Sequence, residues 1–335
     1  MRLFTPLQWA ETFNNVFGRT SNPYNRSLTS GGSSGGEGAL IAMKGSPLGV
    51  GSDSKTLHCP AFYILMLHYV VGGSIRIPSA FNGLYGLRPS YNRIPYRGSA
   101  NSLEGIDSHP SVLGPMTNSM DGIKTFMKSV IGAKPWKKDP LAVNQPWKDG
   151  AYDLVEYGGG KQLVFGIIWD DRTTKPHPPI IRGLEMTRDA LLKAGHKGKC
   201  VPPSFSSYSY FLGKLVVDWK PHKHADLVGC TRAIWRAGAS EDYAAVISIS
   251  GEPLITTMNL DPKGPVSSKT MSFRPLPQDM SAYGLWQVHK MRASLRGEYL
   301  DHWNKTVDET GTGRPVDAII APAAAWAAPP HGKNW

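Results

Sequence analysis

Two glycine clusters, each carrying serine and each leading into a helix-forming run, constrain this chain more than any other feature. The first, residues 31–38, contains five glycines and two serines. The second is Gly72-Gly73-Ser74, which is followed by Arg76 and a small-residue run. Glycine permits backbone conformations that other residues avoid, and its N–H group has no side-chain cover. Such loops suit a site that must hold a negative charge developing on a substrate oxygen.

The composition is that of a folded protein without a membrane span. Of the 335 residues, 41% are apolar, and 37 Lys and Arg against 26 Asp and Glu give a net charge of +11. The longest strongly apolar run, residues 61–71, is shorter than the roughly 20 residues that cross a bilayer. The basic residues are scattered, so we expect no nucleic-acid partner.

The cysteines and the start of the chain predict a cytoplasmic protein. Cys59, Cys200 and Cys230 form no CxxC pair, and three cysteines cannot all pair within one chain. This usage favours a reducing compartment over a secreted disulfide framework. The first twenty residues also lack a basic start followed by an apolar stretch, so no export signal is predicted.

The order of the apolar runs predicts an α/β fold. Strands are expected at 163–169 and 316–321, and helices at 37–43 and 179–194. A last helix carries apolar residues at helical spacing, which we expect to be core: Val288, Met291, Leu295, Tyr299 and Trp303. The alanine- and proline-rich end, 323–335, has no capping element, so the chain is expected to be incomplete.

Several other motifs are weighed and set aside. Gly31, Ser33 and Gly35 satisfy G-x-S-x-G, but the nucleophile elbow of an α/β-hydrolase needs a buried strand before it, and residues 25–30 are polar. A dinucleotide loop lacks its third glycine, and a P-loop lacks Gly-Lys-Ser/Thr. His222 and His224 could bind a metal, yet without a second ligand cluster a solvated surface loop is the favoured interpretation.

The two glycine clusters and their flanks closely resemble the amidase signature family. The matching runs are GGSSGGEGALI at 31–41, GSPLG at 45–49 and GGSIRIP at 72–78. The flanking NVFGRT at 15–20, NPYN at 22–25 and GLYGLRP at 83–89 resemble its acetamidase and fatty-acid amide hydrolase branch. The resemblance implies an α/β amidase signature fold with a mixed central β-sheet flanked by helices, here incomplete at both ends.

The resemblance also implies a hydrolysis mechanism and the residues that carry it. Family members cleave amides with a Ser, cis-Ser, Lys triad, in which the nucleophile matches Ser74 and the cis-serine matches Ser33. The oxyanion is bound by backbone N–H groups, which match those of Val71, Gly72, Gly73 and Ser74. Supporting positions match Ser34, Asp53 and Arg76. The partner implied is a small-molecule amide, with no metal or organic cofactor, and the oligomeric state is left open.

The family lysine has no match in this sequence. By resemblance it lies several dozen residues before the cis-serine, whereas none of the 32 residues before Ser33 is lysine. Lys44 or Lys55 are the candidates to replace it. Since loss of one triad member typically costs about 10³- to 10⁶-fold in rate, two hypotheses stay open. The chain is either an amide hydrolase or a catalytically inactive, truncated pseudoenzyme or faulty gene product.

Spacing predicts two inserts in a single partial amidase domain that covers residues 1–335. Ser74 follows Ser33 by 74 − 33 = 41 positions, about seventeen more than the family spacing. The excess falls at residues 54–70, where the codons can be written with intron donor and acceptor sites whose splicing leaves one isoleucine. The same codon argument predicts retained intron at residues 198–215. Cys59 and Cys200 would then be artefacts of the gene sequence.

Overall fold

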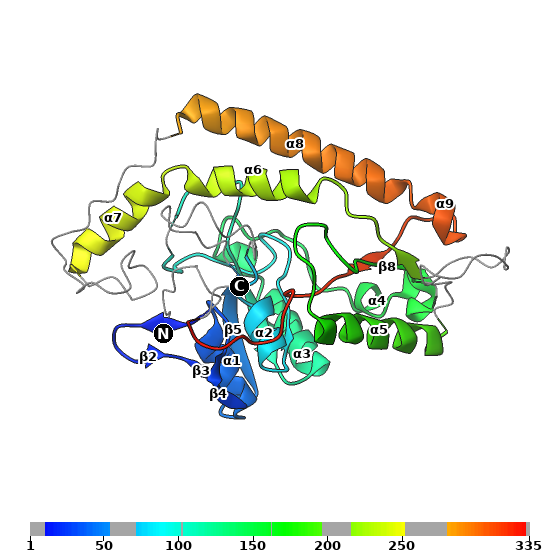
Figure 1. Ribbon diagram of the computed structural model, residues 1–335, viewed down its shortest axis with the longest axis horizontal. Helices are drawn as coiled ribbons and strands as arrows, with labels where there is room; N and C mark the ends of the chain where they lie inside the picture. Colours follow the sequence, from blue (N-terminus) through cyan, green and yellow to red (C-terminus); the bar gives the residue numbers. More distant parts are fainter. Residues whose placement is uncertain are drawn as a thin grey trace. The chain divides into compact units, whose positions relative to one another are not determined.

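The structure is a computed structural model that describes residues 11–53, 72–101, 103–161, 163–195, 216–251 and 280–332. These residues form two compact units (Figure 1). The first unit comprises Met1–Trp147, Cys230–His289 and Ala328–Trp335, and the second comprises Lys148–Gly229 and Lys290–Ala327. The two predicted inserts, residues 54–70 and 198–215, lie outside the described residues.

The first unit contains an antiparallel three-stranded sheet with the order β5-β7-β6. Strands β5 (Leu48–Asp53) and β7 (Val112–Thr117) pair along their full length, with Asp53 opposite Val112. Strand β6 (Tyr85–Gly86) pairs with the other edge of β7. Two hairpins precede this sheet: β1 (Phe13–Asn14) with β2 (Gly18–Arg19), and β3 (Ser21–Asn22) with β4 (Asn25–Thr29).

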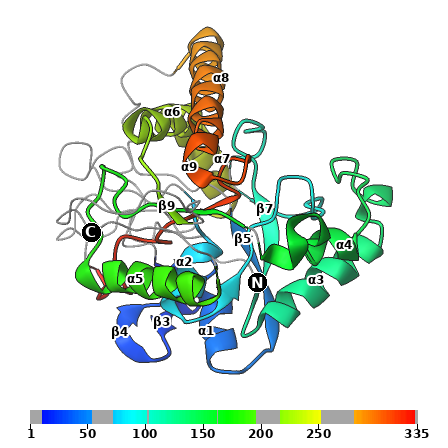
Figure 2. The same ribbon diagram turned by 90° about the vertical axis from the view of Figure 1, so that its right-hand side faces the viewer.

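Helices of the first unit pack on this sheet. Helix α1 (Gly35–Ala42) contacts β5 and α2 (Arg76–Phe81), and α3 (Met120–Gly132) contacts β7 (Figure 2). Ser119 caps α3 because its side chain accepts a hydrogen bond from the Gly122 N–H. The unit also contains the short 3₁₀ helix η2 (Pro135–Lys137) and helix α7 (Ala239–Ser250).

The second unit contains a parallel three-stranded sheet with the order β10-β8-β9. Its strands are β8 (Phe165–Ile167), β9 (Val216–Asp218) and β10 (Ala318–Ile320). Helix α5 (Pro178–Lys193) packs on β9 and buries Leu184 against Ile167 and Val216. The remaining short helices are α4 (Asp149–Tyr152), η3 (Val155–Gly160) and α9 (Val307–Thr310).

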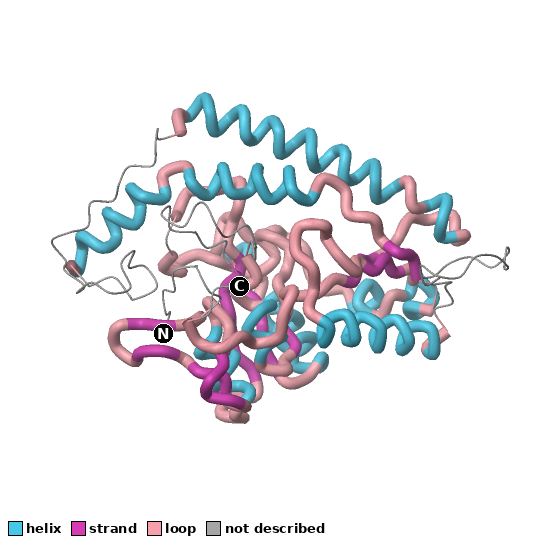
Figure 3. Tube along the Cα trace, viewed as in Figure 1, coloured by secondary structure: helices cyan, strands magenta, loops and turns pink. Residues whose placement is uncertain are grey.

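Two long helices, α6 (His224–Arg236) and α8 (Ala282–Asn304), each contribute residues to both units. Short loops and turns connect most consecutive strands and helices of the described residues, whereas a long loop joins β6 to β7 (Figure 3). Within the described parts of the chain, no helix combines the length and the apolar character that a bilayer crossing requires.

The predicted elements are largely confirmed. The α/β class is correct, and both parallel and antiparallel pairing occur, although in separate small sheets among the described residues. The strands expected at 163–169 and 316–321 correspond to β8 and β10, and the expected helices at 37–43 and 179–194 correspond to α1 and α5. The expectation for α8 is only partly correct. Leu295 is buried, but Met291 is 44% exposed and therefore is not core.

The expectation of a solvated loop is only partly correct for the histidines at 222 and 224. His222 lies in a loop with its side chain 32% exposed, His224 begins α6, and both rings stack on residues of α8. The His222 ring stacks on His302 with centroids 5.0 Å apart, and the His224 ring stacks on Tyr299 at 6.0 Å. No cluster able to hold a metal ion occurs among the described residues. The pair therefore belongs to an aromatic layer of the second unit that also includes Trp219.

This layer predicts a loss of stability in acid. Burial lowers the pKa of His224 below its ordinary value of about 6.5, with His222 and His302 also lowering it and Asp171 opposing them. The folded chain then binds this proton less readily than the unfolded chain, so we expect stability to fall as the pH drops below about 6.5. Urea unfolding at pH 8 and pH 5.5 measures the effect. Equal pH slopes for the wild-type chain and His224→Gln would contradict this assignment.

Candidate active site

A tight turn that directly precedes α2 carries Ser74. Gly72 and Gly73 adopt φ angles of +78° and +112°, which only glycine adopts readily. The Gly73 N–H donates to Asp53 Oδ1 at 2.9 Å, and Arg76 Nε donates to Asp53 Oδ2 at 3.0 Å. The Asp53 side chain is only 1% exposed, whereas that of Arg76 is 48% exposed. The buried carboxylate at the end of β5 therefore fixes the turn, and Arg76 compensates its charge.

Core packing fixes Ser74 from the other side. Ser74 is buried, and the next residue, Ile75, is fully buried in a cluster with Ile41 and Met116. The Ile77 N–H donates to the Gly73 carbonyl at 2.7 Å, which joins the turn to the first residues of α2. Ser74 thus lies between a glycine turn and an anchored hydrophobic residue.

The first glycine loop meets this turn directly. The Gly32–Ser33 peptide bond is cis, as the family resemblance implies for Ser33. The N–H of Ser34 donates to the Ser74 carbonyl at 3.1 Å. The Ser34 hydroxyl accepts from the Ser52 N–H at 3.1 Å and lies 3.4 Å from the Ser52 carbonyl, to which it donates. Ser34 therefore joins both the Ser74 turn and β5.

The structure brings together most residues that the sequence predicts for the site. Hydrogen bonds within the first unit join Ser34 to Ser74, and Asp53 to Gly73 and Arg76. Ser33 and Gly72 are the chain neighbours of Ser34 and Gly73. Val71 lies outside the described residues. The Gly73 N–H, predicted as an oxyanion donor, is directed to Asp53 in this structure.

Lys44 does not join this group. It follows the C-terminal end of α1, where its N–H donates to the Ile41 carbonyl, whereas Ser33 precedes the N-terminal end of the same helix. Eight helical residues rise about 12 Å, which is longer than a lysine side chain. Lys44 is therefore badly placed to act as the base for Ser33. Lys55 lies outside the described residues.

No motif in the sequence points to the buried amides that hold the loops together. Asn82 is fully buried, and its Nδ2 donates to the carbonyls of Ser30 and Pro78, both at 2.8 Å. Asn22 Nδ2 donates to the Phe81 carbonyl at 2.8 Å. These amides tie the segment before the first glycine loop to α2, which follows Ser74. Asparagine forms such contacts anywhere in a chain, so no sequence signal identifies them.

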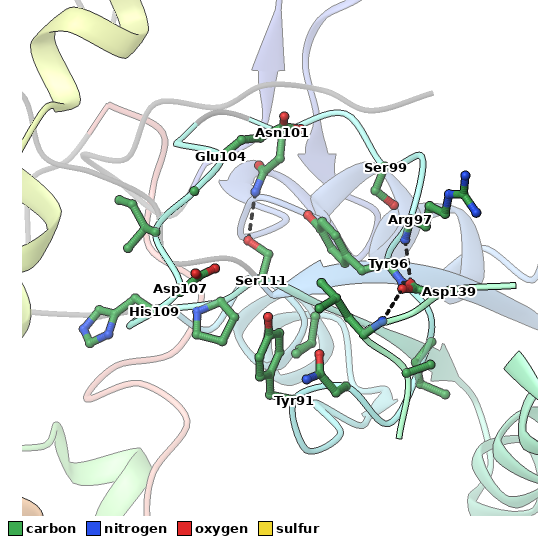
Figure 4. Close-up of a pocket in the computed structure, with 18 of the residues that line it drawn as sticks. Tyr91, Tyr96, Arg97, Ser99, Asn101, Glu104, Asp107, His109, Ser111 and Asp139 are labelled. Atoms are coloured by element: carbon green, nitrogen blue, oxygen red, sulfur yellow. Dashed lines mark hydrogen bonds between the residues drawn. The ribbon is translucent and has the colours of Figure 1, made fainter. Parts of the chain in front are cut away.

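A cavity of about 370 Å³ lies beside the amino end of β7 (Figure 4). Its wall includes Ser111 and Val112, and Val112 pairs with Asp53, the residue that holds the Ser74 turn. Asn101 Nδ2 donates to Ser111 Oγ at 2.8 Å across this wall. The pairing of β5 with β7 thus links a residue that lines the cavity, Val112, to the residue that holds the Ser74 turn.

Asp139 fixes the loop that lines the opposite side of the cavity. Its carboxylate accepts from the N–H groups of Tyr96, Arg97 and Leu141 at 2.7–2.9 Å. Burial alone would raise the pKa of Asp139, but these hydrogen bonds and the charge of Arg97 hold it below its ordinary value. The loop around the cavity is therefore held in place by an ionised carboxylate at neutral pH.

The contact between Asp53 and Gly73 predicts that removing residues 54–70, the first predicted insert, preserves the turn. If one isoleucine replaced residues 54–71, Gly73 would be the third residue after Asp53. Carboxylates commonly accept from an N–H two or three positions later in the chain, so the same bond could form. Shortening the connection from eighteen residues to one is expected to stabilise the protein by roughly 2.5 kcal/mol, since each doubling of loop length costs about 0.6 kcal/mol.

Urea unfolding of a chain lacking residues 54–70 and carrying Val71→Ile measures this gain. Val71→Ile alone is the matched control and is expected to unfold like the wild-type chain. A deletion variant less stable than both would show that residues 54–70 belong to the folded site.

The chain matches one family model and several curated proteins. The model of the family described as Amidase matches residues 5–334. The chain is 38% identical over 329 residues to an acetamidase of Aspergillus oryzae, and 38% identical over 330 residues to an acetamidase of Emericella nidulans. Each alignment covers 98% of this chain and 51% of the relative. The chain therefore spans about half the length of these relatives.

A solved structure of a fatty acid amide hydrolase has a similar fold. It superposes with a TM-score of 0.72 at 27% identity, covering 97% of this chain and 48% of the other. The comparisons thus agree with the resemblance carried by the two glycine loops.

Proposed function

The chain belongs to the amidase family, and from this we propose that it hydrolyses carboxylic acid amides through an acyl-enzyme on Ser74. One observation carries the proposal. The Ser34 N–H donates to the Ser74 carbonyl at 3.1 Å, which joins the loop of the cis peptide at Ser33 to the turn of the nucleophile. The contact supports assigning Ser33 and Ser74, which are 41 positions apart in sequence, to one site.

The reaction follows from serine chemistry. Ser74 Oγ attacks the amide carbonyl carbon, and its proton passes to Ser33, which supplies a proton to the departing nitrogen. The C–N bond breaks, ammonia or an amine leaves, and the acyl group remains as an ester on Ser74. Water then attacks the ester, releasing the carboxylic acid and restoring the Ser74 hydroxyl. The reaction as a whole consumes one amide and one water.

The oxyanion donors are proposed to be the N–H groups of Gly72 and Ser74. The Gly73 N–H donates a hydrogen bond to Asp53. This bond holds the turn in the conformation in which the N–H groups of Gly72 and Ser74 are proposed to face the oxyanion. Backbone donors held before the reaction stabilise charge without reorganising, and loss of one typically costs about 10²- to 10³-fold in kcat. Asp53 and Arg76 are therefore proposed as supports of the oxyanion turn, and Ser34 as the support that joins the two loops.

The alternative, a catalytically inactive chain, is favoured by the position of Lys44. This lysine lies at the far end of α1 from Ser33, so it cannot accept the serine proton as the family lysine does. An inactive chain could still present the Ser33 and Ser74 loops to an amide. Activity and labelling measurements separate the two hypotheses.

A fluorophosphonate probe tests the proposed function. The probe phosphonylates an activated serine with loss of fluoride, and mass spectrometry of the digested chain locates the adduct. We expect the adduct on Ser74, together with hydrolysis of acetamide or of a long-chain fatty amide measured as released ammonia. An adduct on Ser74 without turnover would support the inactive alternative. No adduct on Ser74 and no turnover would reject the proposed mechanism.

A further inference from the structure

Thr12, which no motif singles out, contacts the Ser33 loop at three points. Thr12 is fully buried, and its hydroxyl donates to the Gly31 carbonyl at 2.9 Å. The same hydroxyl accepts from the Gly35 N–H at 3.1 Å and lies 3.4 Å from the Ser33 carbonyl, a second acceptor. One side chain therefore contacts residues on both sides of the cis peptide.

The loop is shaped to receive this hydroxyl. A Cβ atom at Gly35 would lie 2.3 Å from Thr12 Oγ1, so residue 35 must be glycine for the two to meet. The Thr12 carbonyl in turn accepts from the Thr20 N–H at 2.8 Å, which closes the first hairpin. Thr12 thus connects a fixed hairpin to the loop.

The preceding residue, Glu11, is held by the far end of the chain. Glu11 is only 6% exposed, and its Oε1 lies 2.8 Å from His331 Nδ1 and 3.3 Å from the Gly332 nitrogen. Its other oxygen pairs with Arg19 Nε at 3.4 Å. The Nε2 of His331 faces the Arg26 carbonyl at 3.1 Å. Both imidazole nitrogens therefore face acceptor oxygens.

Backbone pairing holds His331 in place. The Thr29 N–H donates to the Pro329 carbonyl at 2.9 Å, and the His331 N–H donates to the Ser27 carbonyl at 3.1 Å. Leu28 and Pro330 form an antiparallel bridge between these bonds. Residues 329–331 therefore extend the edge of β4, which leads directly into the first glycine loop.

We propose that Thr12 is a positioning residue for Ser33, and that the Glu11–His331 pair holds Thr12 in register with the loop. The inference rests on the proposed function, because it assigns the Ser33 loop a part in catalysis. Thr12 acts on the backbone around Ser33 and touches no reacting atom. Its hydroxyl is the feature that matters, so serine is expected to replace threonine and valine is not.

Hydrogen exchange in the full chain tests the positioning role without requiring turnover. Valine has nearly the same shape as threonine but no hydroxyl. In Thr12→Val the Gly35 N–H therefore loses its hydrogen-bond acceptor, and we expect exchange of the Gly35 amide to become about 5- to 10-fold faster. Thr12→Ser is expected to exchange like the wild-type chain. His331→Ala is expected to speed the same amide by about 3-fold, because it loosens Glu11. Amides of β7 serve as the internal reference and should exchange at wild-type rates.

Thr310→Val is the matched control. Thr310 is also fully buried, and its hydroxyl donates to the Arg314 carbonyl, but it belongs to the second unit. This variant is expected to leave the Gly35 amide unchanged. Equal exchange at Gly35 in Thr12→Val and Thr12→Ser would overturn the role of the Thr12 hydroxyl. Wild-type exchange in His331→Ala would overturn the role of the pair.

Steady-state kinetics distinguish a positioning role of Thr12 from a role in stability alone, because only positioning is expected to lower kcat selectively. Thr12→Val is expected to lower kcat for amide hydrolysis by about 10-fold with little change in KM, and Thr12→Ser to restore it. A rise in KM alone would contradict the proposal. If the wild-type chain has neither turnover nor probe adduct, the proposed function fails while the exchange data still decide the positioning role. If Thr12→Val does not fold, Thr12→Ser and His331→Ala decide it.

Discussion

Replacing Ser74 by alanine is expected to lower amide hydrolysis by about 10³- to 10⁶-fold, the range seen when a triad nucleophile is removed. Alanine lacks the oxygen that forms the acyl ester, while the Gly72–Gly73 turn and the contacts of Asp53 stay intact. Ammonia release from the amide substrate, measured at saturating concentration, reports the change. The variant should also lose the fluorophosphonate adduct.

Two further serine variants make this result specific. Ser33→Ala is expected to lower kcat while leaving Ser74 in place, because the proton then has no hydroxyl to pass through. Ser129→Ala, an exposed serine on α3, is the control and should keep wild-type rates. Wild-type turnover in Ser74→Ala would remove Ser74 from the mechanism.

Replacing Asp53 by alanine is expected to cost stability and reactivity together. The carboxylate is buried and holds both the Gly73 N–H and Arg76 Nε, so its loss leaves a buried donor and a cation without a partner. Breaking a fully buried pair typically costs about 3–5 kcal/mol, but the half-exposed Arg76 can be hydrated, so we expect about 2–3 kcal/mol. The released turn is expected to slow Ser74 phosphonylation by about 10²-fold.

Asp53→Asn separates geometry from charge. Asparagine keeps an oxygen that can accept from the Gly73 N–H but does not carry the charge that pairs with Arg76. Urea unfolding and the rate of probe labelling should both fall between wild type and Asp53→Ala. If the two variants behave alike, the charge rather than the hydrogen bond to Gly73 holds the turn. Unchanged labelling in both would exclude Asp53 from supporting the oxyanion turn.

Local patterns predict those elements that depend on neighbouring residues. An apolar run gives β8, and a proline start with a glycine after the last turn gives α5, because both signals act within a few residues. The apolar spacing of α8 correctly predicts a helix but not what covers it, so Met291 is exposed although Leu295 is buried. Apolar periodicity shows which face of a helix is hydrophobic, but it does not show which other element covers that face.

The same distinction applies to the site. The glycine loops predict Ser33 and Ser74 as site residues because each loop motif consists of consecutive residues. Thr12 and Asn82 could not be found this way, since their partners lie 19 and 52 positions away along the chain. The engagement of the Gly73 N–H by Asp53 likewise depends on a contact across 20 positions. Such contacts are created by tertiary folding rather than by a local motif.

The Glu11–His331 pair joins residues that are 320 positions apart in the chain. This separation affects the order in which the two residues are made on the ribosome. At about 5–20 residues per second, His331 is translated roughly 16–64 s after Glu11. For most of that interval the residues of the first hairpin and of the Ser33 loop have been translated, but residues 329–331, which extend the edge of β4, have not. A nascent chain stalled before residue 329 would therefore contain Ser33 and Ser74 but would lack the segment that pairs with β4 and holds Glu11.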